Sequence, residues 1–161
     1  MFTFDFIPFT YSLRRGNTAG TEAPKTIYDE YAIAAFTIDD SKNKMYLVTS
    51  DAAGNIEIQS GGMEGGTLTS LFKNPEEKVG YAADLSLDLV HGYIYWPEYD
   101  FINGIAKIAR GKIDGSGTPD FAYSGLTSDG SQVSNLTIAP NGGPGQRLGN
   151  LTVHFHQVRR K

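Results

Sequence analysis

Two neighbouring segments in the middle of the chain have residue patterns typical of β-strands. The segment YIYW at 93–96 contains only aromatic and β-branched side chains, and Pro97 is predicted to end it because proline cannot donate to a sheet ladder. The segment GIAKIARGKI at 104–113 alternates as a partly exposed strand does. The connection DFING at 100–104 has the length of a hairpin loop. A further alternating segment, MFTFDF at 1–6, is predicted as a strand.

The pattern around this hairpin occurs twice, 49 positions apart. The first copy contains Ala34, Phe36, Ile38, Asp39, Met45, Tyr46 and Leu47, and the second contains Ala83, Leu85, Leu87, Asp88, Ile94, Tyr95 and Trp96. Each copy is an alternating strand, an Asp-led turn, an apolar-Tyr-apolar strand and a third strand. Gly-rich turns at 64–67 and 114–118 then lead to candidate fourth strands. Because four short antiparallel strands form one propeller blade, the repeat predicts an all-β fold of β-propeller blades, with a β-sandwich as the alternative.

The predicted organisation is a single all-β domain over 1–161. Repeat 1 covers about 32–72, repeat 2 about 81–125, and an incomplete repeat 3 about 131–158. A partial propeller cannot close a ring, since closed propellers have about four to eight blades. We therefore expect open apolar faces carrying Phe36, Tyr46, Leu85 and Tyr95, and association with copies of the chain, with another chain or within a longer propeller.

The second repeat resembles a known family. Asp88, then the strand 93–96, the strand GIAKIA at 104–109 and the turn DGSG at 114–117 are similar to one repeat of the YWTD β-propeller of low-density-lipoprotein-receptor-like proteins. The first repeat keeps only the Tyr of this motif, and Trp96-Pro97-Glu98 replaces Trp-Thr-Asp. The resemblance implies a protein-binding or spacer module, and it slightly favours an extracellular location. The first residues lack the charge order of a secretory signal.

The residues of the motif also have a structural interpretation that needs no family. An Asp at the end of a first strand can accept hydrogen bonds from the amides of its own turn, as we expect for Asp39 and Asp88. Tyr46, Tyr95 and Trp96 present large apolar faces and are expected to lie between blades. We interpret all five as structural residues.

Composition limits the classes of partner and the kinds of cysteine chemistry that this protein can have. Nineteen glycines, nine tyrosines and nine phenylalanines among 161 residues favour many short strands. The formal net charge of -4 gives no reason to expect nucleic acid, and no apolar run approaches the roughly 20 residues that span a bilayer. Cysteine is absent, which excludes disulfides and thiolate metal sites.

No catalytic constellation is recognisable, and we predict no cofactor and no metal. His154 and His156 could share one face of a strand, but no third ligand is visible near them. The Gly-rich segment 142–147 lacks the ending of a phosphate-binding loop. Asn135 and Asn150 begin glycosylation sequons, whose occupancy the sequence does not decide.

These observations predict a non-catalytic module for protein binding or assembly, acting through a protein partner or a homo-oligomer. The alternative is a propeller enzyme of the lactonase or strictosidine-synthase type, but the inner strands offer Asp84 as their one charged residue. The candidate partner-binding residues are Glu98, Tyr99, Asp100 and Phe101, because an aromatic pair beside carboxylates on a loop is typical of interfaces.

Overall fold

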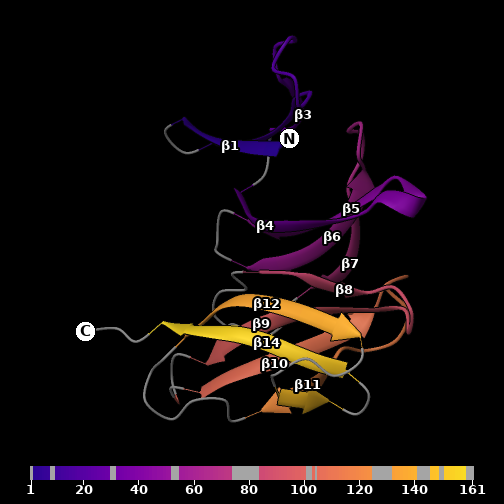
Figure 1. The fold of residues 1–161 in the computed structure, drawn as a ribbon. Coiled ribbons are helices and arrows are strands. Elements are labelled where there is room, and N and C mark those ends of the chain that lie inside the picture. Colours follow the sequence, from indigo (N-terminus) through magenta and orange to yellow (C-terminus); the bar gives the residue numbers. More distant parts are fainter. Residues whose placement is uncertain are drawn as a thin grey trace.

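The chain folds into β-strands arranged in four antiparallel sheets (Figure 1). The computed structural model describes residues 2–7, 10–29, 32–51, 55–73, 84–100, 103, 105–124, 132–140, 146–148 and 151–158. Within these ranges the one helical segment is a short 3-10 turn, Asp40–Lys42, and no helix there is long and apolar enough to cross a membrane. The prediction of an all-β fold is confirmed.

Two of the sheets are four-stranded meanders, in which each strand pairs with the next along the chain. The first blade consists of β4 (Ala32–Asp39), β5 (Lys44–Ser50), β6 (Ile56–Gly62) and β7 (Thr69–Lys73). The second blade consists of β8 (Ser86–Asp88), β9 (Tyr93–Asp100), β10 (Ile105–Lys112) and β11 (Asp120–Ser124). These sheets have the strand number and the antiparallel pairing predicted for propeller blades.

Two three-stranded sheets flank the blades: the N-terminal sheet lies at the top of Figure 1, and β12 of the C-terminal sheet packs on the second blade. The N-terminal sheet has the order β1 (Phe2–Ile7), β2 (Thr10–Arg15) and β3 (Lys25–Tyr28). The C-terminal sheet has the order β12 (Gln132–Pro140), β14 (Leu151–Val158) and β13 (Gln146–Leu148). The sequence predicted a strand for the first residues. In the structure this strand is β1, which pairs with β2 in a three-stranded sheet.

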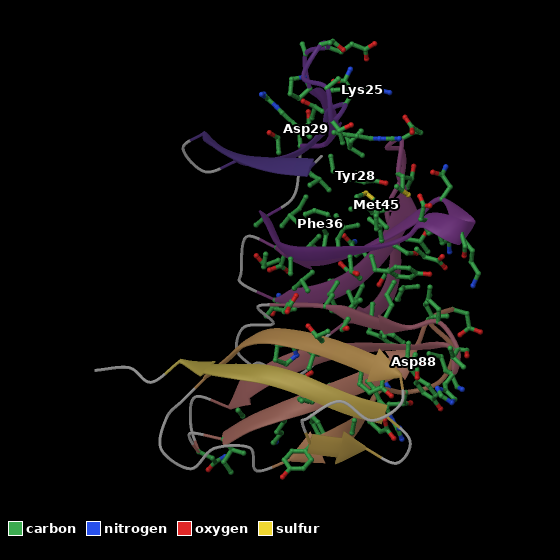
Figure 2. All side chains as sticks on the ribbon, viewed as in Figure 1. Lys25, Tyr28, Asp29, Phe36, Met45 and Asp88 are labelled. Carbon is green, nitrogen blue, oxygen red and sulfur yellow. The ribbon has the colours of Figure 1, made fainter. Side chains whose placement is uncertain are left out.

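Three apolar clusters hold the four sheets together face to face. The first joins the N-terminal sheet to the first blade and includes Leu13, Ile27, Tyr28, Ile33, Met45, Leu47, Met63 and Leu68. The second joins the two blades and includes Ala35, Tyr46, Val48, Ile58, Phe72, Leu85, Ile94, Trp96 and Ala109. The third joins the second blade to β12 through Tyr95, Ile108 and Leu136. Figure 2 shows Tyr28, Phe36 and Met45 between the upper two sheets. The stack is therefore not the two-sheet sandwich of the alternative prediction.

The predicted open faces of the two blades are covered in the structure. Tyr46, Leu85 and Tyr95 are almost completely buried, and Phe36 packs against the first cluster. The expectation that these four residues lie on open faces is wrong. Tyr46 and Leu85 lie between the two blades, the N-terminal sheet covers Phe36, and β12 covers Tyr95. The sequence repeat did not include residues 2–28, so it left the first blade without its neighbour.

Pro97 does not end its strand, contrary to the prediction. β9 continues through Pro97, which pairs with Ile108, and ends at Asp100. A proline fits there because β8 pairs only with Tyr93, Ile94 and Tyr95. Beyond those residues, one side of β9 makes no ladder bonds with β8.

Candidate protein-recognition surface

The turn between β8 and β9 is fixed from inside by a buried carboxylate. Asp88 Oδ1 accepts hydrogen bonds from the backbone N–H of Val90 (3.1 Å) and of His91 (3.0 Å). Its Oδ2 lies 2.7 Å from Nδ1 of the His91 ring. Figure 2 places Asp88 at the turn end of the second blade. The three contacts order a short loop whose two apolar side chains, Leu89 and Val90, remain 51% and 78% exposed.

Beside this turn, two cationic side chains of β10 lie over one tyrosine of β9. Tyr93 pairs with Lys112, and Tyr95 pairs with Arg110. Lys112 Nζ lies 4.1 Å from the centroid of the Tyr93 ring, and Arg110 Cζ lies 5.1 Å from it. Two cations therefore share one aromatic ring, an arrangement in which the ring quadrupole attracts both.

The two cations differ in how far their charge is neutralised. Arg110 forms a bidentate pair with Asp120, with Nε to Oδ1 at 2.8 Å and Nη2 to Oδ2 at 3.0 Å. This pair lowers the pKa of Asp120 and raises the pKa of Arg110. Lys112 is exposed, and no carboxylate of the described chain lies within ion-pair distance of its ammonium.

The turn surface, defined as Leu89, Val90, Tyr93 and Lys112, thus combines exposed apolar side chains with an available ammonium. Such a surface can contact an apolar residue and an adjacent carboxylate of a protein segment. Among the residues with described positions, no group of three or more His, Asp or Glu side chains is arranged to hold a metal ion.

Three of the four predicted partner-binding residues lie at the opposite end of β9. Glu98, Tyr99 and Asp100 belong to the strand itself, so their predicted position in a loop is wrong. Phe101 lies outside the described residues, and for Tyr99 and Asp100 only the backbone is described. Glu98 is half-buried and accepts a hydrogen bond from Trp96 Nε1 at 2.8 Å. Its burial raises its pKa, a shift that the Trp96 bond and the charge of Lys107 oppose.

The five residues with a predicted structural role are all buried. Tyr46 and Trp96 belong to the cluster between the two blades, where the Trp96 ring stacks on Phe72 at 5.6 Å. Tyr95 faces β12 in the third cluster, and burial raises its pKa. Asp88 bonds its own turn as described above, whereas Asp39 accepts a bond from the Ser41 hydroxyl at 2.6 Å.

Sequence reasoning did not single out the turn surface, although a signal for it exists. Tyr93 and Tyr95 are two apart on one strand, and Arg110 and Lys112 are two apart on the next. Side chains two apart share a face, and hairpin pairing places the two faces together. The exposure of Leu89 and Val90 could not be read from their apolar character, which resembles that of core residues.

The stack and these surfaces define an all-β module of propeller-type blades. Among solved structures, the chain is similar to a chain in the crystal structure of a nidogen/laminin complex, with a TM-score of 0.60 and 14% sequence identity. The match covers 80% of this chain and 43% of that chain, so this chain spans less than half of that protein's length. No protein-family description and no curated protein matches the sequence.

Proposed function

We propose that this chain is a non-catalytic, propeller-type module that binds protein or builds an assembly, by self-association or as part of a larger propeller. The observation that carries the proposal is the open stack. An apolar cluster joins each pair of consecutive sheets, yet among the described residues no such cluster joins the first sheet to the last. Propeller blades complete their packing when such ends meet other blades.

The blades belong, in this proposal, to a divergent branch of the YWTD type. The Asp88 turn, the Tyr95–Trp96 strand and the Gly115 turn support it, since each has a defined structural task in the second blade. The structural neighbour supports a propeller-like fold, and its partner in that complex suggests the kind of task such a fold performs.

Two surfaces of the second blade are the proposed contact regions. The turn surface offers exposed apolar side chains and the Lys112 ammonium. The far end of β9 carries Glu98, Tyr99 and Asp100, which sequence composition favours together with Phe101, a residue outside the described ranges. Reversing charges at Lys112 on one surface, and at Glu98 and Asp100 on the other, separates their contributions to any measured association.

Sedimentation at micromolar concentration tests the assembly. We expect a defined species heavier than the 17.5 kDa of one chain. A folded 17.5 kDa species that stays unchanged on dilution would contradict self-association, and the module would then depend on a different protein. Metal analysis of the purified protein addresses the enzyme alternative, because stoichiometric calcium or zinc would favour a propeller enzyme.

A further inference from the structure

The N-terminal sheet repeats the third and fourth strands of the two blades. Each of the three sheets has an apolar residue followed three positions later by a glycine and four positions after that by a second glycine: Leu13, Gly16 and Gly20; Ile58, Gly61 and Gly65; Ile108, Gly111 and Gly115. The second glycine has a positive φ in all three, at 67°, 97° and 78°. These turns need glycine for the same backbone reason.

The strand register makes the equivalence of the three sheets specific. A bulge follows the pair Leu13 and Tyr28 in the N-terminal sheet, the pair Ile58 and Phe72 in the first blade, and the pair Ile108 and Tyr123 in the second. β2 and β3 therefore correspond to β6 and β7, and to β10 and β11. Because β1 precedes β2 as β5 precedes β6, β1 is the second strand of a blade. The described N-terminal sheet contains no strand in the first position.

The C-terminal end shows the converse arrangement. Leu136 of β12 shares a cluster with Ile108 of the preceding sheet, as Leu85 does with Ile58 and Phe36 does with Leu13. β12 is thus a first strand, and Asp84 Oδ2 accepts a bond of 2.6 Å from its Leu136 N–H. The strand beside it is β14, which follows β13 in the chain, so the meander order of the blades is lost here.

We propose that the two ends complete each other between two copies of this chain, so that β12 of one copy pairs with β1 of the other. This inference rests on the proposed assembly function and names its partner. Two shared blades then form, each from β12 of one copy and β1, β2 and β3 of the other, and each chain adds its own first and second blades. A closed propeller has about four to eight blades, so two chains, with six blades, are the number that closes a ring.

The residue types of β1 suit the second strand of the shared blade better than those of β14 do. His154 of β14 lies opposite Thr137, and His156 lies opposite Asn135. In the first blade the corresponding second-strand residues are Tyr46 and Val48, both buried. The register with β2 assigns Phe2 and Phe4 of β1 to these positions. β1 therefore supplies the apolar residues typical of a second strand, and β14 supplies two histidines.

The exchange replaces one backbone ladder of β12 with another. β12 loses its ladder with β14 and gains one with β1, whose outer edge pairs with no strand among the described elements. An open edge next to an apolar pattern is a strand-pairing site. The β13–β14 hairpin moves away from β12 when the second copy binds.

Engineered disulfides test the pairing, because the chain contains no cysteine. The register predicts that Thr137 of one copy faces Phe2 of the other, and residues paired across strands are close enough for a disulfide. We expect Phe2→Cys with Thr137→Cys to give, under mild oxidation, a covalent dimer of twice the 17.5 kDa chain mass. Thr137→Cys with His154→Cys is the matched control, which locks β12 to β14 within one chain and should leave a monomer.

The outcomes separate this inference from the assembly function. If the unmodified protein associates but the Phe2 and Thr137 cysteines cross-link no faster than Thr137→Cys alone, the exchange is wrong and assembly stands. If the His154 and Thr137 lock leaves association unchanged, β12 is not the exchanged strand. If the unmodified protein stays at 17.5 kDa and no cross-link forms, self-association fails as well, and the first strand comes from another polypeptide segment. Circular dichroism of both double variants verifies that they fold.

Discussion

The two complete blades share a framework and differ in what they expose. Both have four antiparallel strands, a bulge at the same place and a third-strand glycine beneath an aromatic ring of the preceding sheet, Tyr28 over Gly61 and Phe72 over Gly111. Of the four large apolar side chains exposed in the described chain, Leu89, Val90 and Phe121 belong to the second blade and Ile38 to the first. The framework depends on stacking, which both blades share, whereas the surface chemistry is concentrated in the second blade.

The Asp-led turns show the same contrast at one residue. Asp88 has hydrogen-bond partners for both carboxylate oxygens, including the His91 ring. Asp39 Oδ2 has no hydrogen-bond partner in the described structure, and Lys42 Nζ lies 3.8 Å from it. In the first blade a short 3-10 helix, Asp40–Lys42, follows Asp39, and the Asp39 side chain makes no capping hydrogen bond to it. One sequence motif therefore performs two different tasks.

Truncating the aromatic residues between sheets should have the largest effect, and should affect both blades equally. We expect Tyr46→Ala, Tyr95→Ala and Trp96→Ala each to lower the free energy of unfolding by about 3–5 kcal/mol, because each leaves a large cavity. Urea unfolding at one fixed protein concentration measures it, since association makes stability depend on concentration. Losses below about 1 kcal/mol for Tyr95 and Trp96 would contradict their position between sheets.

Replacing the third-strand glycines with alanine tests whether, in both blades, a glycine is needed beneath the aromatic ring of the preceding sheet. A Cβ on Gly61 would overlap the Tyr28 hydroxyl, and one on Gly111 would overlap the Phe72 ring. We expect Gly61→Ala and Gly111→Ala to cost about 1–3 kcal/mol each, as overpacking does. Gly16→Ala is the matched control, because its Cβ would make ordinary contact with Pro24 at 3.6 Å. Equal stability of all three variants would contradict the need for glycine beneath the aromatic rings.

Removing the carboxylates of the two Asp-led turns should lower stability more in the second blade than in the first. Asp88→Ala leaves two backbone amides without their acceptor, and we expect a loss of about 1–3 kcal/mol. Asp39→Asn keeps a side-chain oxygen for the Ser41 hydroxyl and should cost less than about 1 kcal/mol. Thermal unfolding of Asp88→Asn and Asp39→Ala completes the comparison, and identical losses at the two positions would remove the distinction between the turns.

Glu98 should give the smallest effect, and one that depends on pH. Burial raises its pKa in the folded protein, so protonation favours folding. Its contribution is present below the unfolded pKa and is lost as pH rises through the higher folded pKa. Glu98→Gln keeps an acceptor for Trp96 Nε1 and should slightly stabilise the protein at neutral pH, with no gain below about pH 4. A gain that persists in acid would have another cause.

Much of the second blade could be predicted because its signals are local. Aromatic and β-branched residues located β9 and alternation located β10, although proline propensity alone misplaced the end of β9. The repeat located the Asp turns and the buried Tyr46, Tyr95 and Trp96. The candidate site was less accessible, since Glu98 was expected in a loop and instead bonds Trp96 from within the strand. The turn surface depends on which apolar residues remain uncovered, a property of the packed molecule.

The sequence by itself determined the strand-forming segments, the Gly and Asp turns and the four-strand unit, because period, β-propensity and turn chemistry act over a few neighbouring residues. Only the tertiary structure decided that β1, β2 and β3 form a sheet that covers one face of the first blade and buries Met45. The second blade covers the other face and buries Tyr46. It also decided that Lys112 and Val90 remain exposed. These outcomes depend on contacts between segments far apart in the chain, where burial of apolar area by the neighbouring sheet outweighs local preference.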